Sequence, residues 1–323
     1  MEFKYKIALD ANGLDLGPIE ALEASKIFIN NNPDTEIHLV GDFKEMQTDN
    51  LPTNIKIYQN DTKSVNPRDI RQVMRENISI NQAIDLVRNN EASGIISGGD
   101  SGSYLSSLTF KLKRLENVSR PAFMGVALSI KNEPVLMLDI GASLEAKPEY
   151  YVEWAHLADR FYKVMYKVEN PKLTLINIGV EEYKGTQNLR DANDLLKQEN
   201  FNYIGFSEPR ELLKGNYQIA LSDGYGGNLT IKGFEGGLLT FKEALKIHVK
   251  NSFMAKMGAL LMKGAFKKVA ATFDYRNIAT AWVIGVNAPA IKIHGASDKN
   301  TIQVALKNMK DALEFDLMSH LKG

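Results

Sequence analysis

The sequence predicts an α/β fold, with a largely parallel sheet and helices on both faces. Three observations predict this fold: short, almost continuously apolar segments alternate with amphipathic segments of helical length, and Gly-rich loops join them. Strands buried on both faces have this apolar pattern, and parallel strands need crossover helices. With no linker, repeat or low-complexity tract, residues 1–323 are expected to form a single α/β domain, in one or two lobes.

Each expected strand is an apolar run that ends in, or is directly followed by, Gly, Asp or Ser, and each expected helix has its apolar residues three or four apart. The expected strands are residues 6–10, 36–41, 93–97, 134–139, 173–178, 203–206 and 218–221. The helices expected between them are residues 19–28, 70–75, 81–89, 104–115 and 148–165. The last third differs: we expect two long helices over 229–272, strands at 281–286 and 290–293, and a closing helix over 300–321.

Composition excludes several classes of protein. The 39 basic and 39 acidic residues give a formal net charge of +0, which argues against extensive nucleic-acid binding. The absence of cysteine excludes disulfides, a thiolate nucleophile, Cys-ligated zinc and iron–sulfur clusters. The five histidines, at 38, 156, 248, 294 and 320, have no metal-ligand spacing, so no metal site is expected.

The N-terminal segment MEFKYKIALDANG has no long apolar core of the kind that a secretory signal needs. No stretch approaches the roughly 18 uninterrupted apolar residues that indicate a membrane-spanning helix. We therefore expect a cytoplasmic protein that can touch a membrane without crossing it.

Gly, Asp, Asn and Ser are concentrated where the expected strands end. In parallel sheets ligands bind beyond the carboxyl ends of the strands, where helix N-termini present N–H groups and Gly lets an anion come close. Each loop alone could simply turn the chain, but their number favours a shared anion site. The five loops are residues 10–17, 98–103, 139–147, 177–185 and 222–228.

Common nucleotide motifs are missing. The chain has no G-x-x-x-x-G-K-[ST], and no G-x-G-x-x-G follows the first strand. Residues 99–102 spell the GDSG of secreted serine proteases, but they lie in a strand-to-helix loop with no suitable histidine, so we interpret the match as accidental.

Two residues are candidates for catalysis. Lys184 follows an apolar strand, where its ammonium could face a bound anion, or it could simply pair with Glu181 or Glu182 in solvent. Asn228 could donate its amide N–H to a carbonyl oxygen, or it could cap the helix that follows.

Four aspartates, Asp10, Asp15, Asp139 and Asp223, end strands or open loops. They could take part in chemistry or fix loop geometry by accepting backbone N–H groups. His294 could bind an anion, although a structural histidine is the more common case.

Residues 241–272 form a basic amphipathic tract with seven lysines and one acid, Glu243. On a helical wheel Phe253, Met257, Leu260 and Leu261 share one face, which Lys256, Lys263 and Lys267 flank. Such a tract suits a membrane surface or an acidic partner, and equally a buried helix pair or a dimer interface.

Taken together, the loops resemble those of the bacterial phosphate acyltransferases. The matching stretches keep the order of that family and span nearly the whole chain. They are LDANGLDLGP (9–18), SGGDSGS (97–103), RPA (120–122), MLDIGASLEAKPE (137–149), NIGVEEYKG (177–185), SDGYGGN (222–228) and VIGVNAPAIKIHG (283–295).

The resemblance implies an enzyme that moves a fatty acyl group from acyl carrier protein to inorganic phosphate, giving acyl phosphate for phospholipid synthesis. It implies a fold like that of isopropylmalate dehydrogenases and phosphotransacetylases, with a projecting helix pair over about 229–272. It further implies a homodimer attached peripherally to the inner face of the cell membrane, with no cofactor and no nucleic-acid partner.

Carried over to this chain, the resemblance makes Lys184 and Asn228 catalytic and gives Phe253, Met257, Leu260 and Leu261 to membrane or dimer contacts. The residues expected to bind phosphate or substrate are Asp10, Gly13, Asp15, Gly99, Ser101, Gly102, Asp139, Gly141, Lys147, Gly185, Asp223, Gly227 and His294.

The chain departs from the family pattern at Leu14, Asp100, Ser103, Ser143 and the segment 279–282. Asp100 matters most, because a carboxylate beside a phosphate site repels the ligand unless it points away or is neutralised.

Three other functions are open at this stage. A phosphotransacetylase-like enzyme would use acyl-CoA, and a decarboxylating dehydrogenase of the same fold would need a metal and a nicotinamide cofactor. A non-catalytic relative would act as a membrane-associated scaffold for lipid synthesis.

Overall fold

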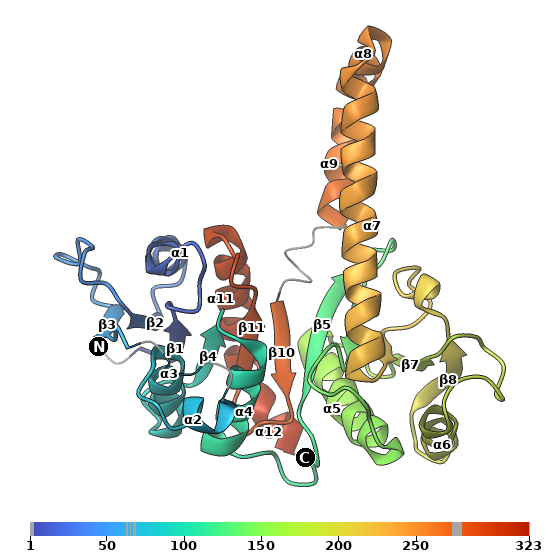
Figure 1. The fold of residues 1–323 in the computed structure, drawn as a ribbon, viewed down its shortest axis with the longest axis horizontal. Coiled ribbons are helices and arrows are strands. Elements are labelled where there is room, and N and C mark those ends of the chain that lie inside the picture. Colours follow the sequence, from blue (N-terminus) through green and yellow to red (C-terminus); the bar gives the residue numbers. More distant parts are fainter. Residues whose placement is uncertain (1–2, 63, 65, 67–68, 273–279, 323) are drawn as a thin grey trace.

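The computed structural model describes residues 3–62, 64, 66, 69–272 and 280–322. Eleven strands form one sheet (Figure 1). They are β1 (Tyr5–Asp10), β2 (Thr35–Gly41), β3 (Ile55–Gln59), β4 (Gly94–Ser97), β5 (Ala122–Leu128), β6 (Pro134–Leu138), β7 (Lys172–Ile176), β8 (Asn202–Ser207), β9 (Ile219–Leu221), β10 (Thr280–Ile284) and β11 (Ala290–Ile293).

The helices lie between these strands and after the last one, and the group between β9 and β10, described below, projects from the body. Those in the body are α1 (Pro18–Asn31), α2 (Ile70–Val73), α3 (Ser79–Arg88), α4 (Ser101–Leu112), α5 (Pro148–Tyr166), α6 (Gln187–Leu196), α11 (Lys299–Glu314), α12 (Leu317–Lys322) and the 3-10 helix Pro209–Glu211.

The sheet consists of two parallel groups joined through an antiparallel centre. Its order is β3-β2-β1-β4-β11-β10-β5-β6-β9-β7-β8. Strand β10 is antiparallel to β11 and β5, and β5 is antiparallel to β6, whereas the other neighbours pair in parallel. Three reversals make the first group, β3 to β11, run opposite to the second group, β6 to β8. The expectation of a largely parallel sheet is confirmed.

Helices cover both faces of the sheet, as expected. Successive residues of a strand point to opposite faces, so Leu9 and Ala8 of β1 enter different clusters. Leu9 belongs to the core under α1, α5 and α11, where Trp154 is fully buried. Ala8 belongs to the core under α3 and α4, which includes Leu108.

Several elements differ from the sequence prediction. Strands β3 and β5 and helix α6 are absent from the sequence prediction, although β5 is a continuous apolar run and α6 is amphipathic. The helix expected over 104–115 is wrong at both ends: Asp100 caps α4 three residues earlier, and Lys113, with φ of 68°, ends it. The closing helix is split at Asp316, which has φ of 49°, into α11 and α12.

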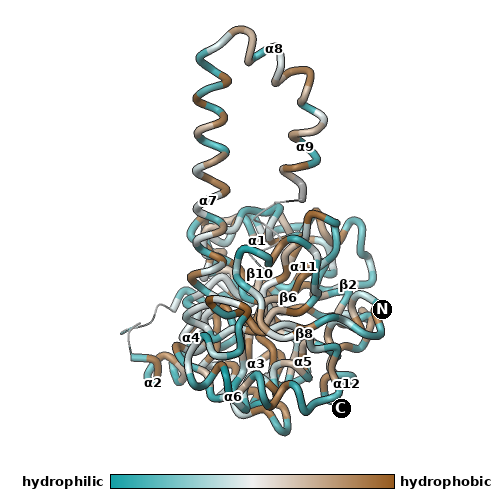
Figure 2. The backbone as a smooth tube through the Cα atoms, turned by 90° about the vertical axis from the view of Figure 1, so that its right-hand side faces the viewer, coloured by the Kyte–Doolittle hydropathy of each residue, from teal (hydrophilic) through white to brown (hydrophobic). Residues whose placement is uncertain are grey.

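The sequence predicts two long helices over 229–272, but the structure has three helices in this region. Helix α7 (Gly224–Lys250) begins earlier, and the return path is broken into α8 (Phe253–Leu261) and α9 (Lys263–Thr272). Figure 2 shows α7 rising from the body and α8 and α9 returning toward it, with apolar and polar residues interleaved. Because Met262 ends α8, Lys263 and Lys267 lie on a different helix from Leu261. Among the described residues, no helix is long and apolar enough to span a bilayer.

The loop after β6 is organised by the buried carboxylate of Asp139. Its Oδ1 accepts hydrogen bonds from the backbone N–H groups of Phe123 (3.1 Å), Gly141 (3.0 Å) and Ala142 (2.9 Å). Its Oδ2 accepts from the N–H (2.8 Å) and the hydroxyl (2.7 Å) of Ser143. Burial raises the pKa of Asp139, and these hydrogen bonds oppose the rise. The carboxylate therefore ties the loop to β5 and sets its shape.

The start of α7 lies directly against this loop, and two glycines make the contact possible. A Cβ atom on Gly227 would lie 1.9 Å from the carbonyl oxygen of Asp139, and one on Gly224 would lie 2.1 Å from that of Ser143. Both distances are far below van der Waals contact. The backbone of α7 can therefore meet the loop only because these positions have no side chain.

We predict opposite effects for two Gly→Ala substitutions in α7. Gly227→Ala should lower the free energy of unfolding by about 1–3 kcal/mol, because the new methyl group overpacks the contact with Asp139. Gly236→Ala should raise it by about 0.5–1 kcal/mol, because nothing lies within 4 Å of its added Cβ and Ala favours a helix. Urea-induced unfolding measures both, and a Gly227→Ala protein as stable as the wild type would contradict the close contact.

Candidate active site

A cavity of about 290 Å³ lies where the two parallel groups of the sheet meet. Strands β5, β10 and β11, the loop after β6, and the beginnings of α4 and α7 contribute to it. We call it the central cavity. Its lining residues are Ser101, Phe123, Ile140, Gly141, Asn228, Ile231, Lys232, Glu235, Ala281, Lys292, Ile293 and His294.

Asn228 presents an amide donor to the central cavity. It lies in the second turn of α7, and its Nδ2 atom would be 3.3 Å from a Cβ placed on Gly141. Its side chain makes no hydrogen bond to any residue that the structure describes. Asp223 caps α7 by accepting from the N–H of Gly226 at 2.6 Å, so the alternative in which Asn228 is the cap is wrong. The amide of Asn228 is available for a ligand.

Cationic groups outnumber carboxylates in the lining of the central cavity. Among the described residues, Lys232 and Lys292 contribute ammonium groups, and Glu235 is the one acidic side chain that lines it. Partial burial and then the nearby Lys292 lower the pKa of His294, although its side chain is still exposed at the rim. The cavity is therefore suited to an anion of small size.

Lys292 is the functional candidate that the sequence analysis missed. Its Nζ donates to the carbonyl oxygen of Gly98 at 3.3 Å and to that of Ile293. Burial lowers the pKa of Lys292 to about 8, against the opposing effect of nearby aspartates. The available signal was its position between Ile291 and Ile293, because a lysine inside a buried strand needs an explanation.

A second cavity of about 500 Å³, here called the N-terminal cavity, receives Asp10, Gly13 and Gly99. Asp10 is buried and accepts from the hydroxyl groups of Ser79 (2.7 Å) and Ser97 (2.6 Å). Burial raises the pKa of Asp10, and the hydrogen bonds oppose that change. A Cβ on Gly13 would lie 2.2 Å from the backbone nitrogen of Gly99, so the first two loops touch here.

Asp100 does not point its carboxylate into the central cavity. It caps α4, its Oδ1 accepting from the N–H of Ser103 at 2.8 Å, and it lines the N-terminal cavity instead. Gly102 lies in the first turn of the same helix. Asp15 is held beside the last loop, where its N–H donates to the carbonyl oxygen of Gly295 at 2.8 Å. The carboxylates of Asp100 and Asp15 therefore do not line the central cavity.

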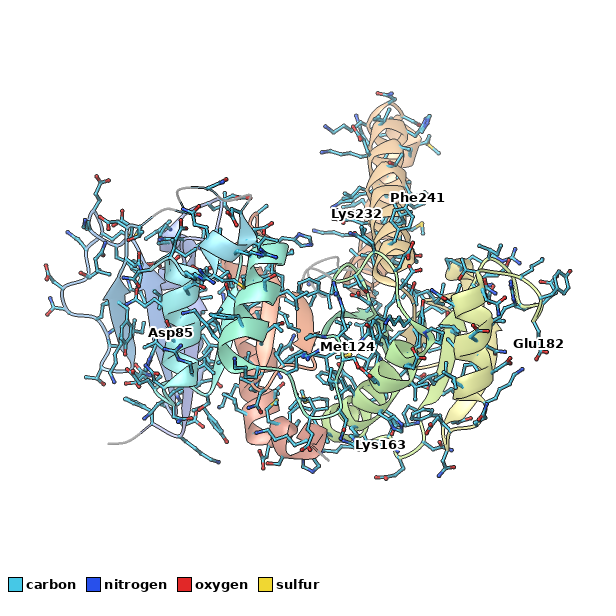
Figure 3. All side chains as sticks on the ribbon, turned by 60° about the horizontal axis from the view of Figure 1, so that its bottom comes forward. Asp85, Met124, Lys163, Glu182, Lys232 and Phe241 are labelled. Carbon is cyan, nitrogen blue, oxygen red and sulfur yellow. The ribbon has the colours of Figure 1, made fainter. Side chains whose placement is uncertain are left out.

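Lys184 lies outside the lining of both cavities. Its Nζ is 2.8 Å from Oε2 of Glu181, and this hydrogen-bonded pair raises the pKa of Lys184. Gly185 has φ of 89° and packs against Asn177, whose amide donates to the carbonyl oxygen of Lys184. Figure 3 places Glu182, from the same loop, far from Lys232 at the lower part of α7. In this structure Lys184 is thus part of a surface ion pair.

The other predicted positions have structural surroundings. Lys147 is exposed at the N-cap position of α5, and Asp139, Asp223 and Gly227 form the contact between the loop after β6 and α7. Ala279, which opens the segment departing from the family pattern, lies outside the described residues. Within the described part of the chain, no group of three His, Asp or Glu side chains could hold a metal ion.

Comparisons with known proteins agree on one family. A family model described as "Fatty acid synthesis protein" matches residues 5–320. The chain is 44% identical to a phosphate acyltransferase of Mycoplasmopsis agalactiae over 324 residues, which cover 98% of this chain and 97% of the relative. It is also 44% identical to a phosphate acyltransferase of Mycoplasmopsis pulmonis over 309 residues, 95% of each chain.

Among solved structures, the fold resembles a phosphotransacetylase from Streptococcus pyogenes. The TM-score is 0.63 and the sequence identity is 11%, with 98% of this chain and 95% of the other covered. At that identity the likeness concerns the fold, whereas the sequence matches extend over nearly the whole chain. The chain belongs to the phosphate acyltransferase family.

Proposed function

We propose that the chain transfers a fatty acyl group from the thioester of acyl carrier protein to inorganic phosphate, and that the reaction takes place in the central cavity. The observation that carries the proposal is the lining of this cavity. It combines Lys232, Lys292 and His294 with the unpaired amide of Asn228 in a space of about 290 Å³. An anionic nucleophile and a carbonyl group are the two partners that such a lining suits.

The reaction needs no covalent intermediate on the protein. A phosphate oxygen attacks the thioester carbon, the C–O bond forms, and the carbonyl oxygen becomes an oxyanion. The oxyanion then collapses, the C–S bond breaks, and the proton of hydrogen phosphate goes to the leaving thiolate. The products are acyl phosphate and free carrier protein. The protein's task is to hold two reactants together and stabilise negative charge, which agrees with a chain that has no cysteine.

In this scheme Asn228 donates to the thioester oxygen, and amides of the loops around residues 99–102 and at Gly141 help to position phosphate. Lys184 is proposed to pair with phosphate or with the oxyanion. For that role its ammonium must leave Glu181 and the 177–185 loop must move toward the cavity. Exposed ion pairs of this kind stabilise proteins little, so a bound anion could compete for the lysine.

The projecting helices supply the second part of the proposal, in which the protein forms a homodimer and binds peripherally to a membrane. In α8 Phe253, Met254 and Leu261 are 75%, 77% and 86% exposed, and the helix has no buried residue. Apolar side chains with such high exposure indicate binding to a lipid surface or to a second copy of the chain. The lysines of residues 241–272 would add attraction to anionic lipid or to the acidic carrier protein.

The test of the reaction is incubation with palmitoyl–acyl carrier protein and inorganic phosphate. Acyl phosphate and free carrier protein should form together, and both should depend on added phosphate. A protein that forms acyl phosphate only from acyl-CoA would be a phosphotransacetylase-like enzyme. Binding of carrier protein or vesicles without any product would leave the scaffold as the better account.

We predict that Asn228→Ala lowers turnover by about 10²–10³-fold, as expected for loss of one oxyanion donor. Thr240→Ala, on the exposed part of α7, is the matched control and should leave turnover unchanged. Near-wild-type turnover in Asn228→Ala would remove this residue from the mechanism.

We predict that Lys184→Ala also lowers turnover by about 10²–10³-fold, if the ammonium of Lys184 reaches the reacting groups in the wild type. Lys197→Ala, a lysine that pairs with Glu182 of the same loop at 2.5 Å, is the control. Equal activities of the two variants in the phosphate-dependent assay would restrict Lys184 to the ion pair seen here.

For the projecting helices, Leu261→Glu should weaken binding to anionic vesicles by about tenfold or more, because it removes apolar area and adds a repelling charge. Vesicle co-sedimentation measures this effect. Ile130→Glu changes a residue of similar character, 61% exposed at the β5–β6 turn, and should bind as the wild type does. If Leu261→Glu binds normally but sediments as a smaller species, the surface belongs to the dimer and not to the membrane.

A further inference from the structure

Lys292 occupies an unusual place for a lysine. It lies within β11, where Ile291 and Ile293 are buried in the core under α1 and α11. Because side chains alternate along a strand, Lys292 projects to the opposite face, where α4 and α7 begin. There it lines the central cavity together with Ser101 and Asn228.

A structural explanation of Lys292 is weak. The ammonium is largely removed from water, yet within the described residues no carboxylate lies close enough to form an ion pair with it. Its two hydrogen bonds go to the uncharged carbonyl groups of Gly98 and Ile293. Burying a cation without a counter-ion lowers stability, so such a group is retained for another reason. An ammonium has three donors, and the described residues accept from two of them, so the third is available to a ligand within this part of the chain.

Three aspartates near Lys292 favour the charged form of its ammonium, although none of them forms an ion pair with it within the described part of the chain. Asp10, Asp15 and Asp100 each favour the protonated form of Lys292 electrostatically. Asp10 accepts from two serine hydroxyls, and Asp100 caps α4. Lys292 therefore lines the central cavity and also interacts electrostatically with these carboxylates, so its charge offsets theirs for an anion bound there.

We propose that Lys292 binds the phosphate nucleophile, its ammonium donating to a phosphate oxygen in the central cavity, with Lys232 and His294 lining the same space. The inference rests on the proposed function, because it names the residue that holds one of the two reactants. It also accounts for Asp100, a carboxylate beside the site whose charge Lys292 balances.

The first experiment is steady-state kinetics of Lys292→Met. The KM for phosphate should rise roughly 10- to 100-fold, the range expected for losing a hydrogen bond from a charged group, while the KM for acyl carrier protein stays unchanged. Lys307→Met is the matched control, because Lys307 is exposed on α11 and pairs only with Asp311 among the described residues. An unchanged KM for phosphate in Lys292→Met would overturn the proposal.

A pH profile of Lys292→Arg gives an independent readout. In the wild type, kcat/KM for phosphate should fall above about pH 8, where the ammonium loses its proton. Arginine stays charged throughout, so the decline should disappear in Lys292→Arg. The other ionisable groups around Lys292 are Asp10, Asp15 and Asp100 on one side and His294, Lys232 and Glu235 on the other. A decline with the same midpoint in both proteins would show that the ammonium of Lys292 does not cause it and would contradict the proposal.

Phosphate binding without turnover separates this inference from the proposed function. A ³¹P NMR titration with inorganic phosphate should show weaker binding to Lys292→Met than to the wild type. If the wild type forms no acyl phosphate, the proposed reaction fails, but this difference in binding still supports the site. Equal binding by both proteins overturns the site even if the wild type is active.

Thermal unfolding tests whether Lys292 has a structural role. The pKa of Lys292 is about 8 in the folded protein against 10.5 for a free lysine, so the buried charge costs stability below pH 8, and the cost declines as pH rises from 8 to 10.5. Lys292→Met should therefore unfold at neutral pH at a temperature equal to or above that of the wild type. A much lower unfolding temperature would mean that Lys292 is structural.

Discussion

The contact between the carboxylate-bound loop after β6 and the first turns of α7 is the constraint on which the rest of the site depends. Asp139 fixes the loop by accepting hydrogen bonds from five donor groups, and Gly224 and Gly227 bring the helix backbone onto it. Through this contact α7 packs against the loop that leaves β6, the strand of the second group that pairs with β5. The contact also places the side chain of Asn228 next to Gly141. It includes the beginning of α7, the long helix that leads into the lysine-rich amphipathic tract 241–272.

The two groups of strands contribute different chemical groups to the central cavity. The second group of strands contributes Asn228, a neutral donor suited to a developing oxyanion, whereas the first group contributes Lys292 and His294. The first group of strands also contains the buried carboxylate of Asp10, which favours the charged form of the Lys292 ammonium. Phosphate and thioester would thus be held by opposite halves of the sheet, and the antiparallel pair β10 and β5 brings those halves together.

Local patterns in the sequence were enough to predict the alternation of strands and helices and the loops at the strand ends. They could not predict which loops meet, because that depends on the reversal of direction at β10 and β5. The structure brings Ser101, Asn228 and His294 to one cavity, whereas Lys184 lies in another loop, outside that lining. Lys292 could not be predicted from the loops, because it lies inside β11, whereas the groups that bind ligands in parallel sheets usually lie beyond the strand ends.

The central claim is that phosphate binds where the two groups of strands meet. A crystal structure with inorganic phosphate bound tests it most directly. The account predicts phosphate density in the central cavity, within hydrogen-bonding distance of Lys292 Nζ and close to Asn228. Phosphate bound at the 177–185 loop, with Lys184 released from Glu181 and the central cavity without phosphate, would contradict it.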